Sequence, residues 1–157
     1  MDVYLMQHGE AVSADVDPER PLDPTGQANV AAVAARAALC GVRVDRIRHS
    51  DRLRAVQTAH LLGRTLACAD VAPAVRLHPN DAVEVAAFEL VDPAREGSIA
   101  IVGHLPFLDR FAAHLVTGDQ STQVVAFRNA ALVKLVPGKD PARFAVVWVL
   151  PPELALP

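Results

Sequence analysis

The sequence predicts a single α/β domain of three layers, in which a largely parallel central sheet carries helices on both of its faces. Short apolar runs, typical of strands buried on both faces, alternate along the chain with longer runs of helical spacing. This alternation is typical of parallel strands joined by crossover helices. The 157 residues can build one core, and no repeat, low-complexity tract or linker divides them, so we expect one domain over residues 1–157.

Six segments are predicted as strands. The clearest is the fourth, because residues 99–102 are continuously apolar. The first strand begins almost at the N-terminus, and the last two flank a Pro-Gly turn. The predicted strands cover residues 2–7, 44–49, 73–77, 97–103, 130–136 and 143–150.

Four helices are predicted from apolar residues that recur at helical spacing. In the second helix, Ala55, Ala59, Leu62 and Leu66 form one apolar stripe, and Ser50 is expected to cap the N-terminus. The predicted helices cover residues 25–40, 51–66, 82–91 and 105–115, and residues 151–157 are left unassigned.

Composition narrows the classes of partner and compartment. The net charge is −3 and the pI about 6.0, so no overall positive field favours nucleic acid or an anionic membrane. Cys40 and Cys68 form no CxxC pattern, which suits a reducing compartment. The N-terminus has neither a basic region nor a long apolar stretch, so we expect a cytoplasmic protein without a membrane span.

Chemically active side chains follow three of the predicted strands. His8 comes directly after the first strand, Arg54 follows the second, and His104 follows the fourth. In parallel sheets, ligands bind at the carboxyl ends of the strands, and the first turn of a helix favours anions. A phosphate-sized dianion would meet imidazole, guanidinium and backbone N–H groups there. The remaining histidines are expected to be ordinary polar residues: His49, His60, His78 and His114.

Four short segments carry a resemblance to the histidine phosphatase superfamily. Residues 6–11 resemble its Arg-His-Gly signature, with Gln in place of Arg, and residues 50–59 resemble its Ser…Arg-Ala…Gln-Thr-Ala signature. Residues 102–104 resemble the third signature, which supplies a second histidine, and residues 19–26 are similar to a stretch of SixA-type phosphohistidine phosphatases. The resemblance extends in order over residues 1–115 and implies a phosphoglycerate mutase-like fold.

The resemblance implies a metal-free and cofactor-free mechanism. His8 would attack phosphorus and form a covalent phosphohistidine that water hydrolyses. Arg54 and a protonated His104 would bind the oxygens of the transferring group, and Arg20 would add a further cation. Gly9 and Gly103 would let the backbone approach the phosphate. The residues expected to bind phosphate are Gln7, Gly9, Arg20, Arg54 and His104.

Gln7 stands where members of the superfamily usually carry an arginine that binds the phosphoryl group. Glutamine keeps an N–H donor but lacks the positive charge and the bidentate fork. Loss of one preorganised donor commonly lowers the rate by about 10²–10³-fold, so a reduced activity is expected. The fold assignment does not depend on this residue.

The leaving group favours phosphohistidine on a partner protein as the substrate. Asp81 and Glu84 are the candidate general acids, but both are more often found as solvated carboxylates. Phosphohistidine can leave as neutral imidazole and needs less acid catalysis than an alkoxide. About 30 residues separate the second helix from the fourth strand, which is too short for a long lid and suits a phosphate displayed on a protein surface.

Two alternatives remain open at this point. The domain could bind phosphorylated partners without turnover, as a weak or inactive module, or it could act on small phosphates as a mutase or phosphomonoesterase. Nucleotide binding has little support because no GxGxxG or GxxxxGK[ST] pattern occurs, and no HExxH pattern points to zinc. The expected partner is a phosphorylated histidine-containing protein domain, and the chain is expected to be a monomer or a weak dimer.

Overall fold

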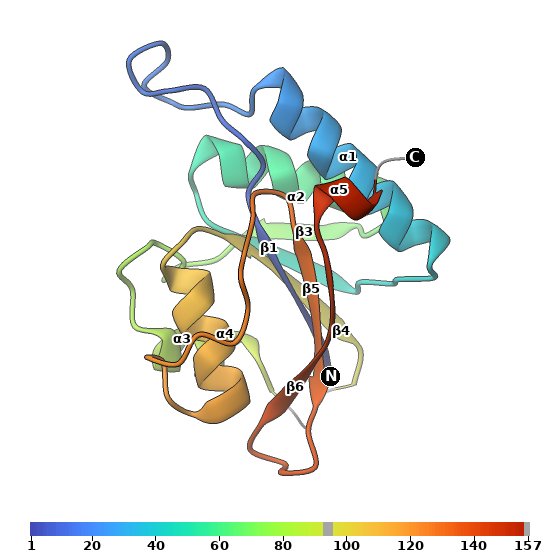
Figure 1. Cartoon of the computed structure of the whole chain (residues 1–157), viewed down its shortest axis with the longest axis vertical. Coiled ribbons are helices and arrows are strands. Elements are labelled where there is room, and N and C mark those ends of the chain that lie inside the picture. The colour runs from blue at the N-terminus through green and yellow to red at the C-terminus, as the bar shows by residue number, and fades with distance from the viewer. Residues whose placement is uncertain (93–95, 156–157) are drawn as a thin grey trace.

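A computed structural model describes residues 1–92 and 96–155 of the chain, and in it a six-stranded sheet runs in the order β3-β2-β4-β1-β5-β6 (Figure 1). The strands β1 to β4 are mutually parallel where they pair, whereas β5 is antiparallel to both β1 and β6. The strands are β1 (Asp2–Gln7), β2 (Arg46–His49), β3 (Asp70–Pro73), β4 (Ser98–Gly103), β5 (Leu132–Pro137) and β6 (Phe144–Leu150).

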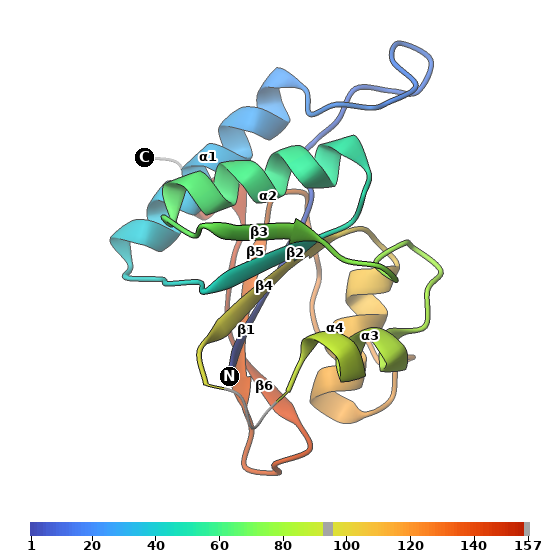
Figure 2. The same ribbon diagram turned by 180° about the vertical axis from the view of Figure 1, so that it is seen from behind.

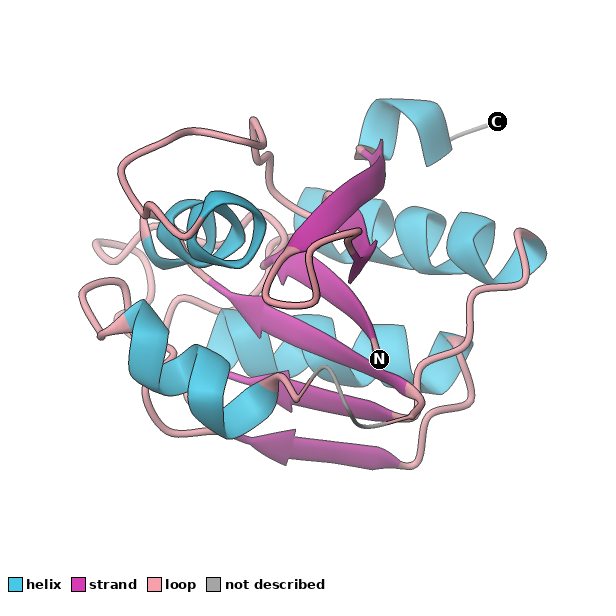
Figure 3. Cartoon of the chain, turned by 90° about the horizontal axis from the view of Figure 1, so that it is seen from below, coloured by secondary structure: helices cyan, strands magenta, loops and turns pink. Residues whose placement is uncertain are grey.

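Helices cover both faces of this sheet, which makes a single α/β domain of three layers. α1 and α2 lie together on one face with the short α5, and α3 and α4 lie on the other (Figures 2 and 3). The helices are α1 (Pro24–Leu39), α2 (Leu53–Thr65), α3 (Val83–Leu90), α4 (Phe107–Thr117) and α5 (Pro152–Ala155).

The two hydrophobic clusters explain why the central strands are continuously apolar. Along β1, Val3 and Leu5 pack into the cluster beneath α3 and α4, while Tyr4 and Met6 pack into the cluster beneath α1 and α2. Successive side chains of a strand point to opposite faces, so a strand covered on both faces has no polar side. All six residues of β4 are buried for the same reason.

The register of the central strands brings their carboxyl ends level. Gln7 of β1 lies opposite Gly103 of β4, and His49 of β2 lies opposite Val102. The ladder continues one residue further, because the His8 N–H donates to the Gly103 carbonyl at 3.1 Å. His8 and His104 therefore leave the sheet side by side.

The first helix is placed against the loop that follows β1. Asp23 caps α1 by accepting a hydrogen bond from the Gly26 N–H at 2.7 Å, and Pro24 occupies the first turn. A Cβ on Gly26 would lie 2.1 Å from the Glu10 carbonyl oxygen, so only glycine allows this close approach. The contact fixes the chain just beyond His8.

Two local predictions are wrong. The third strand is Asp70–Pro73 rather than residues 73–77. Leu77 lies outside any strand, and it is apolar because it is buried in the core cluster. α2 begins at Leu53, and its N-cap position is Arg52, which makes no side-chain capping bond. Ser50 lies before the helix and is available for another contact.

The unassigned C-terminal segment contains α5, which packs against α1. Within residues 1–92 and 96–155, no helix has both the length and the apolar character needed to cross a membrane.

Candidate active site

His8 is held in one orientation and one tautomer at the end of β1. Its Nδ1 lies 2.6 Å from the Gly9 carbonyl oxygen, and its Nε2 accepts a hydrogen bond from Arg54 Nε at 3.1 Å. A carbonyl only accepts, so Nδ1 carries the proton and Nε2 carries the lone pair. Burial lowers the pKa of His8, the hydrogen bond to Gly9 opposes this, and the charges of Arg54 and Arg20 lower it further. The ring is therefore neutral at pH 7, with Nε2 as its nucleophilic atom.

Arg54 lies in the first turn of α2 and is half-buried beside His8. Burial and the neighbouring charges of Arg20 and Arg52 lower its pKa, but an arginine stays protonated at neutral pH. Its Nε is committed to His8, so the two terminal nitrogens of its guanidinium remain available to an anion.

His104 follows β4 and is only 3% exposed. Its ring centroid lies 5.0 Å from that of His8, and its Nε2 lies 2.8 Å from Ser50 Oγ. Burial, followed by the charges of His8 and Arg54, lowers the pKa of His104 to about 3. Burial therefore favours the neutral ring of His104, and its protonation beside a bound phosphoryl group stays a prediction.

Gly9 is tightly packed just after His8. Its N–H donates to Thr58 Oγ1 at 3.1 Å, so this amide is already used. A Cβ at Gly9 would lie 2.9 Å from both the Gly26 carbonyl oxygen and a methyl group of Val30. The missing side chain therefore allows the close packing of α1 against the loop after β1, and a contact of Gly9 with phosphate stays a prediction.

Gln7 is turned toward the C-terminal half of the chain. Its Nε2 donates to Asn129 Oδ1, and its Oε1 is buried without a hydrogen-bond partner among the residues described. No recorded hydrogen bond joins the Gln7 side chain to His8, Arg54 or His104 within the described ranges. Position 7 contributes no positive charge to the site.

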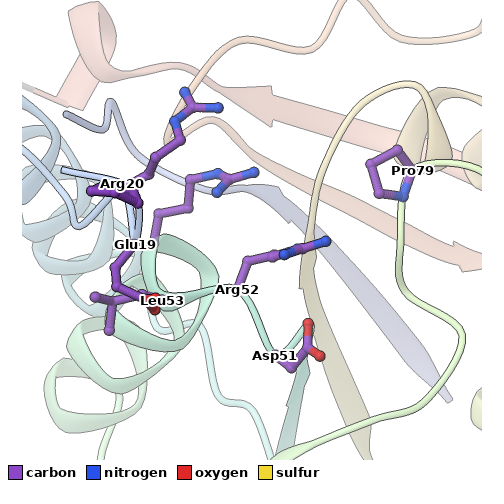
Figure 4. A pocket seen from close by; sticks show the side chains of 8 residues that line it. Glu19, Arg20, Asp51, Arg52, Leu53 and Pro79 are labelled. Atoms are coloured by element: carbon purple, nitrogen blue, oxygen red, sulfur yellow. The ribbon is translucent and has the colours of Figure 1, made fainter. Parts of the chain in front are cut away.

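A pocket of about 370 Å³ opens beside the histidine pair. Arg20 reaches it from the loop after β1, where its Nε donates to the Val12 carbonyl at 3.3 Å. Figure 4 shows Arg20 and Arg52 extending into the opening, with Pro79 across from them. The lining residues are Pro18, Glu19, Arg20, Asp51, Arg52, Leu53, Arg54 and Pro79.

The candidate general acids have structural contacts elsewhere. The Asp81 carboxylate accepts the His78 N–H at 2.8 Å and closes a turn, and the exposed Glu84 accepts a hydrogen bond from Gln120 at 2.6 Å. In the part of the chain that is described, neither carboxylate has a recorded contact with His8. The acid role of Asp81 and Glu84 stays a prediction.

The other histidines are placed around the site or away from it. His49 is buried, with Nδ1 2.9 Å from the Ser50 carbonyl oxygen and its ring 5.9 Å from that of His60. His78 Nε2 lies 3.5 Å from the Asp51 carboxylate. His114 lies in the last turn of α4.

Four residues of the site received no role from the sequence. Ser50 and Thr58 stand inside the second signature, so their position in that segment was an available signal. Arg52 lines the pocket together with its chain neighbours but matches no position of the signature, and Asn129 has no local signal. Asn129 reaches Gln7 across 122 residues because β5 runs beside β1.

Comparison with known proteins gives the same fold for the whole chain. The protein histidine phosphatase SixA complexed with tungstate is 24% identical, with a TM-score of 0.85 over 97% of each chain. A phosphoserine phosphatase from Entamoeba histolytica is 12% identical, with a TM-score of 0.74 over 99% of each chain. A mycobacterial glucosyl-3-phosphoglycerate phosphatase is 18% identical, with a TM-score of 0.67 over 94% of this chain and 98% of the other.

Sequence comparison agrees with the fold. An uncharacterized protein of Picosynechococcus sp. is 30% identical over 147 residues, which cover 88% of this chain and 86% of that protein. The model of the histidine phosphatase superfamily (branch 1) matches residues 3–79, a range that includes His8 and Arg54. This chain, with its phosphoglycerate mutase-like fold, therefore belongs to the histidine phosphatase superfamily.

Proposed function

We propose that this protein is a phosphohistidine phosphatase that moves a phosphoryl group from a partner protein to His8 Nε2 and then to water. The observation that carries the proposal is the contact between Arg54 Nε and His8 Nε2 at 3.1 Å. It places a cation beside the lone pair of a neutral imidazole, which is the arrangement that a nucleophile for an anionic phosphorus centre requires.

The first step exchanges one N–P bond for another. The lone pair of His8 Nε2 attacks phosphorus while the bond from phosphorus to the substrate imidazole breaks. A substrate ring that carries a proton on its other nitrogen leaves as neutral imidazole, so no side chain has to supply a proton. A water molecule then attacks the phosphorus on His8, releases inorganic phosphate with the water proton, and restores the neutral ring.

The neighbouring groups stabilise the transferring phosphoryl group. When His8 attacks, Arg54 Nε releases the lone pair of His8 Nε2, and the terminal nitrogens of Arg54 donate to the phosphoryl oxygens. Arg20 adds positive charge nearby. A dianion beside His104 raises the pKa of that ring from about 3, because an opposite charge favours the protonated form. Ser50 Oγ fixes the ring in place for this task.

Phosphohistidine suits this site better than an alkyl phosphate. Among the residues described, the recorded hydrogen bonds of the Asp81 and Glu84 carboxylates go to His78 and Gln120, which favours a leaving group that needs no general acid. Proteins named for phosphohistidine, phosphoserine and a sugar phosphoglycerate share the fold, so the choice of substrate rests on the residues of the site. We further expect the protein to act in the cytoplasm, as a monomer or weak dimer.

The deciding experiment traps the intermediate on His8. The protein is mixed with a histidine phosphotransfer domain carrying labelled phosphohistidine, quenched in alkali, and analysed for acid-labile phosphate by mass spectrometry. We expect label on His8, release of phosphate, and loss of both in His8→Ala. The matched control is His60→Ala, an exposed histidine on α2, which should behave as the unchanged protein.

Three outcomes would contradict the proposal. Undiminished turnover by His8→Ala would exclude the nucleophile. Stoichiometric binding of the phosphorylated domain without release of phosphate would favour a binding module. Steady hydrolysis of a sugar phosphate, with the phosphorylated domain untouched, would favour a small-molecule phosphomonoesterase.

A further inference from the structure

The arginine pocket, defined as the pocket lined by Arg20, Arg52 and Arg54, is adjacent to the histidine pair rather than identical with it. Neither His8 nor His104 lines it, and Arg54 is the residue that belongs to both places. A volume of about 370 Å³ lies within the range of about 300–1,000 Å³ found for small-ligand clefts. The pocket therefore has room for more of a substrate than the phosphoryl group itself.

Its three guanidinium groups are not neutralised by partner carboxylates. Elsewhere in the described structure arginines form close ion pairs, such as Arg48 with Asp70 at 2.8 Å and Arg76 with Glu89 at 3.4 Å. No ion pair of this kind is recorded for Arg20, Arg52 or Arg54 within residues 1–92 and 96–155. The pocket is thus a cluster of like charges.

The two acidic residues of the wall do not cancel this cluster. The Asp51 carboxylate lies 3.5 Å from His78 Nε2, on the side of a neighbouring pocket. Figure 4 shows the Glu19 carboxylate on the side of Leu53, away from the ends of the Arg20 and Arg52 side chains. The guanidinium ends therefore face an opening that favours an anion.

The charge of Arg52 is felt at the reacting groups. It lowers the pKa of both Arg54 and His104, and Arg20 also lowers the pKa of Arg54. Holding like charges this close costs folding free energy, which a bound anion offsets. Arg52 is exposed and lines the pocket, so its guanidinium is accessible to a group beside a phosphohistidine.

We propose that Arg52, together with Arg20, binds a carboxylate that lies beside the phosphohistidine on the partner protein, while Arg54 holds the phosphoryl group. The inference rests on the proposed function and adds a selectivity for acidic surroundings of the phosphohistidine. The planar guanidinium matches a carboxylate through two parallel N–H donors. A site for one phosphoryl group alone would not need three guanidinium groups.

The test compares two peptides that differ only beside the phosphohistidine. One peptide has Glu beside the phosphohistidine and the other has Gln. Binding is measured with peptides that carry a phosphonate analogue of phosphohistidine, and turnover with peptides that carry phosphohistidine itself. An exposed ion pair is worth about 0.2–1 kcal/mol, so two cations on one carboxylate predict a preference of about two- to thirtyfold for the Glu peptide in Kd and in kcat/KM. The preference in kcat/KM should come from a lower KM for the Glu peptide, with kcat equal for the two peptides.

Two variants of Arg52 and one control identify the residue responsible. Arg52→Gln should reduce the preference to about one- to fivefold, the value of a single ion pair, and Arg52→Glu should reverse it in favour of the Gln peptide. The matched control is Arg64→Gln, which removes an exposed arginine from the last turn of the same helix. It should keep the full preference, since Arg64 does not line the arginine pocket.

The outcomes separate this inference from the proposed function. Equal Kd values for the two peptides, or a preference that Arg52→Glu leaves unchanged, would overturn the inference even if phosphohistidine is hydrolysed. Failure to hydrolyse either peptide would overturn the proposed function, and the Kd comparison would still decide the inference. Tighter, Arg52-dependent binding of free phosphoserine than of either peptide would assign the carboxylate to a small phosphorylated acid and overturn the assignment to a protein.

Discussion

Replacing Thr58 with valine removes a hydroxyl that joins the loop after β1 to α2. Thr58 lies in α2 and is 0% exposed. Its Oγ1 accepts the Gly9 N–H at 3.1 Å and donates to the Arg54 carbonyl at 2.8 Å. The loop that carries His8 is thereby bound to the helix turn that carries Arg54. Valine has nearly the same shape, so the substitution removes the hydrogen bonds without opening a cavity.

The expected loss of stability depends on which hydrogen bonds the two partners of Thr58 keep in the variant. The Arg54 carbonyl retains its helical hydrogen bond, whereas the buried Gly9 N–H is left without an acceptor. A buried donor left unsatisfied costs about 1–3 kcal/mol. For a domain of this size each 1 kcal/mol lowers Tm by about 2–4 °C, so Thr58→Val should melt about 2–12 °C lower. The rate should fall as well, through kcat, because His8 and Arg54 lose their common support.

Thr65→Val is the matched control, measured by urea denaturation and steady-state kinetics. Thr65 is in the same helix and its hydroxyl donates to the Leu61 carbonyl at 3.0 Å, but it is exposed and holds no other segment. Its substitution should change stability by about 0.5 kcal/mol or less. If both variants lose the same stability and activity, Thr58 does not join the loop to the helix as argued.

Three further predictions concern the histidine, the glutamine and a glycine. His104 binds its proton near pH 6.5 when unfolded and near pH 3 when folded, so its contribution to stability is complete above pH 6.5 and falls with decreasing pH. Between pH 7 and pH 5 the unchanged protein should lose about 2 kcal/mol more in urea denaturation than His104→Asn, and parallel losses would contradict this. Gln7→Arg should raise kcat about tenfold and Gln7→Leu should lower it, whereas a slower arginine variant would show that the glutamine has a dedicated role. Gly26→Ala should cost about 2 kcal/mol or more, because its Cβ would lie 2.1 Å from the Glu10 carbonyl oxygen. Gly41→Ala, which has open space but a φ of +77°, should cost only about 1–2 kcal/mol in the same thermal melt.

The predicted strand ends were informative because the sheet rules are strong for buried parallel strands. The continuous apolar runs at β1 and β4 could only be strands covered on both faces, and this fixed where His8 and His104 leave the sheet. β3 was misplaced because it is an edge strand of half-exposed residues with little pattern. The apolar Leu77 beside it indicated burial but not the type of structure.

Properties that depend on contacts between distant residues were beyond the sequence. The low pKa of His104 follows from its burial and from the charges of His8 and Arg54, which lie far away along the chain. The partner of Gln7 follows from the antiparallel placement of β5 beside β1, which a βα pattern does not indicate. The motifs gave the residue types of the site, but not which hydrogen bonds were already used within it.

The same positive charges act twice in the proposed reaction. Before the substrate binds, burial and the added charges of Arg54 and Arg20 lower the pKa of His8 and keep Nε2 unprotonated, so the nucleophile is available at neutral pH. When the phosphoryl dianion arrives, it compensates these charges and makes protonation of the buried His104 more favourable. Substrate binding and proton uptake at His104 are therefore coupled, since each stabilises the other by the same free energy. A site that held His104 protonated from the start would add a further charge next to His8 and would lose this order of events.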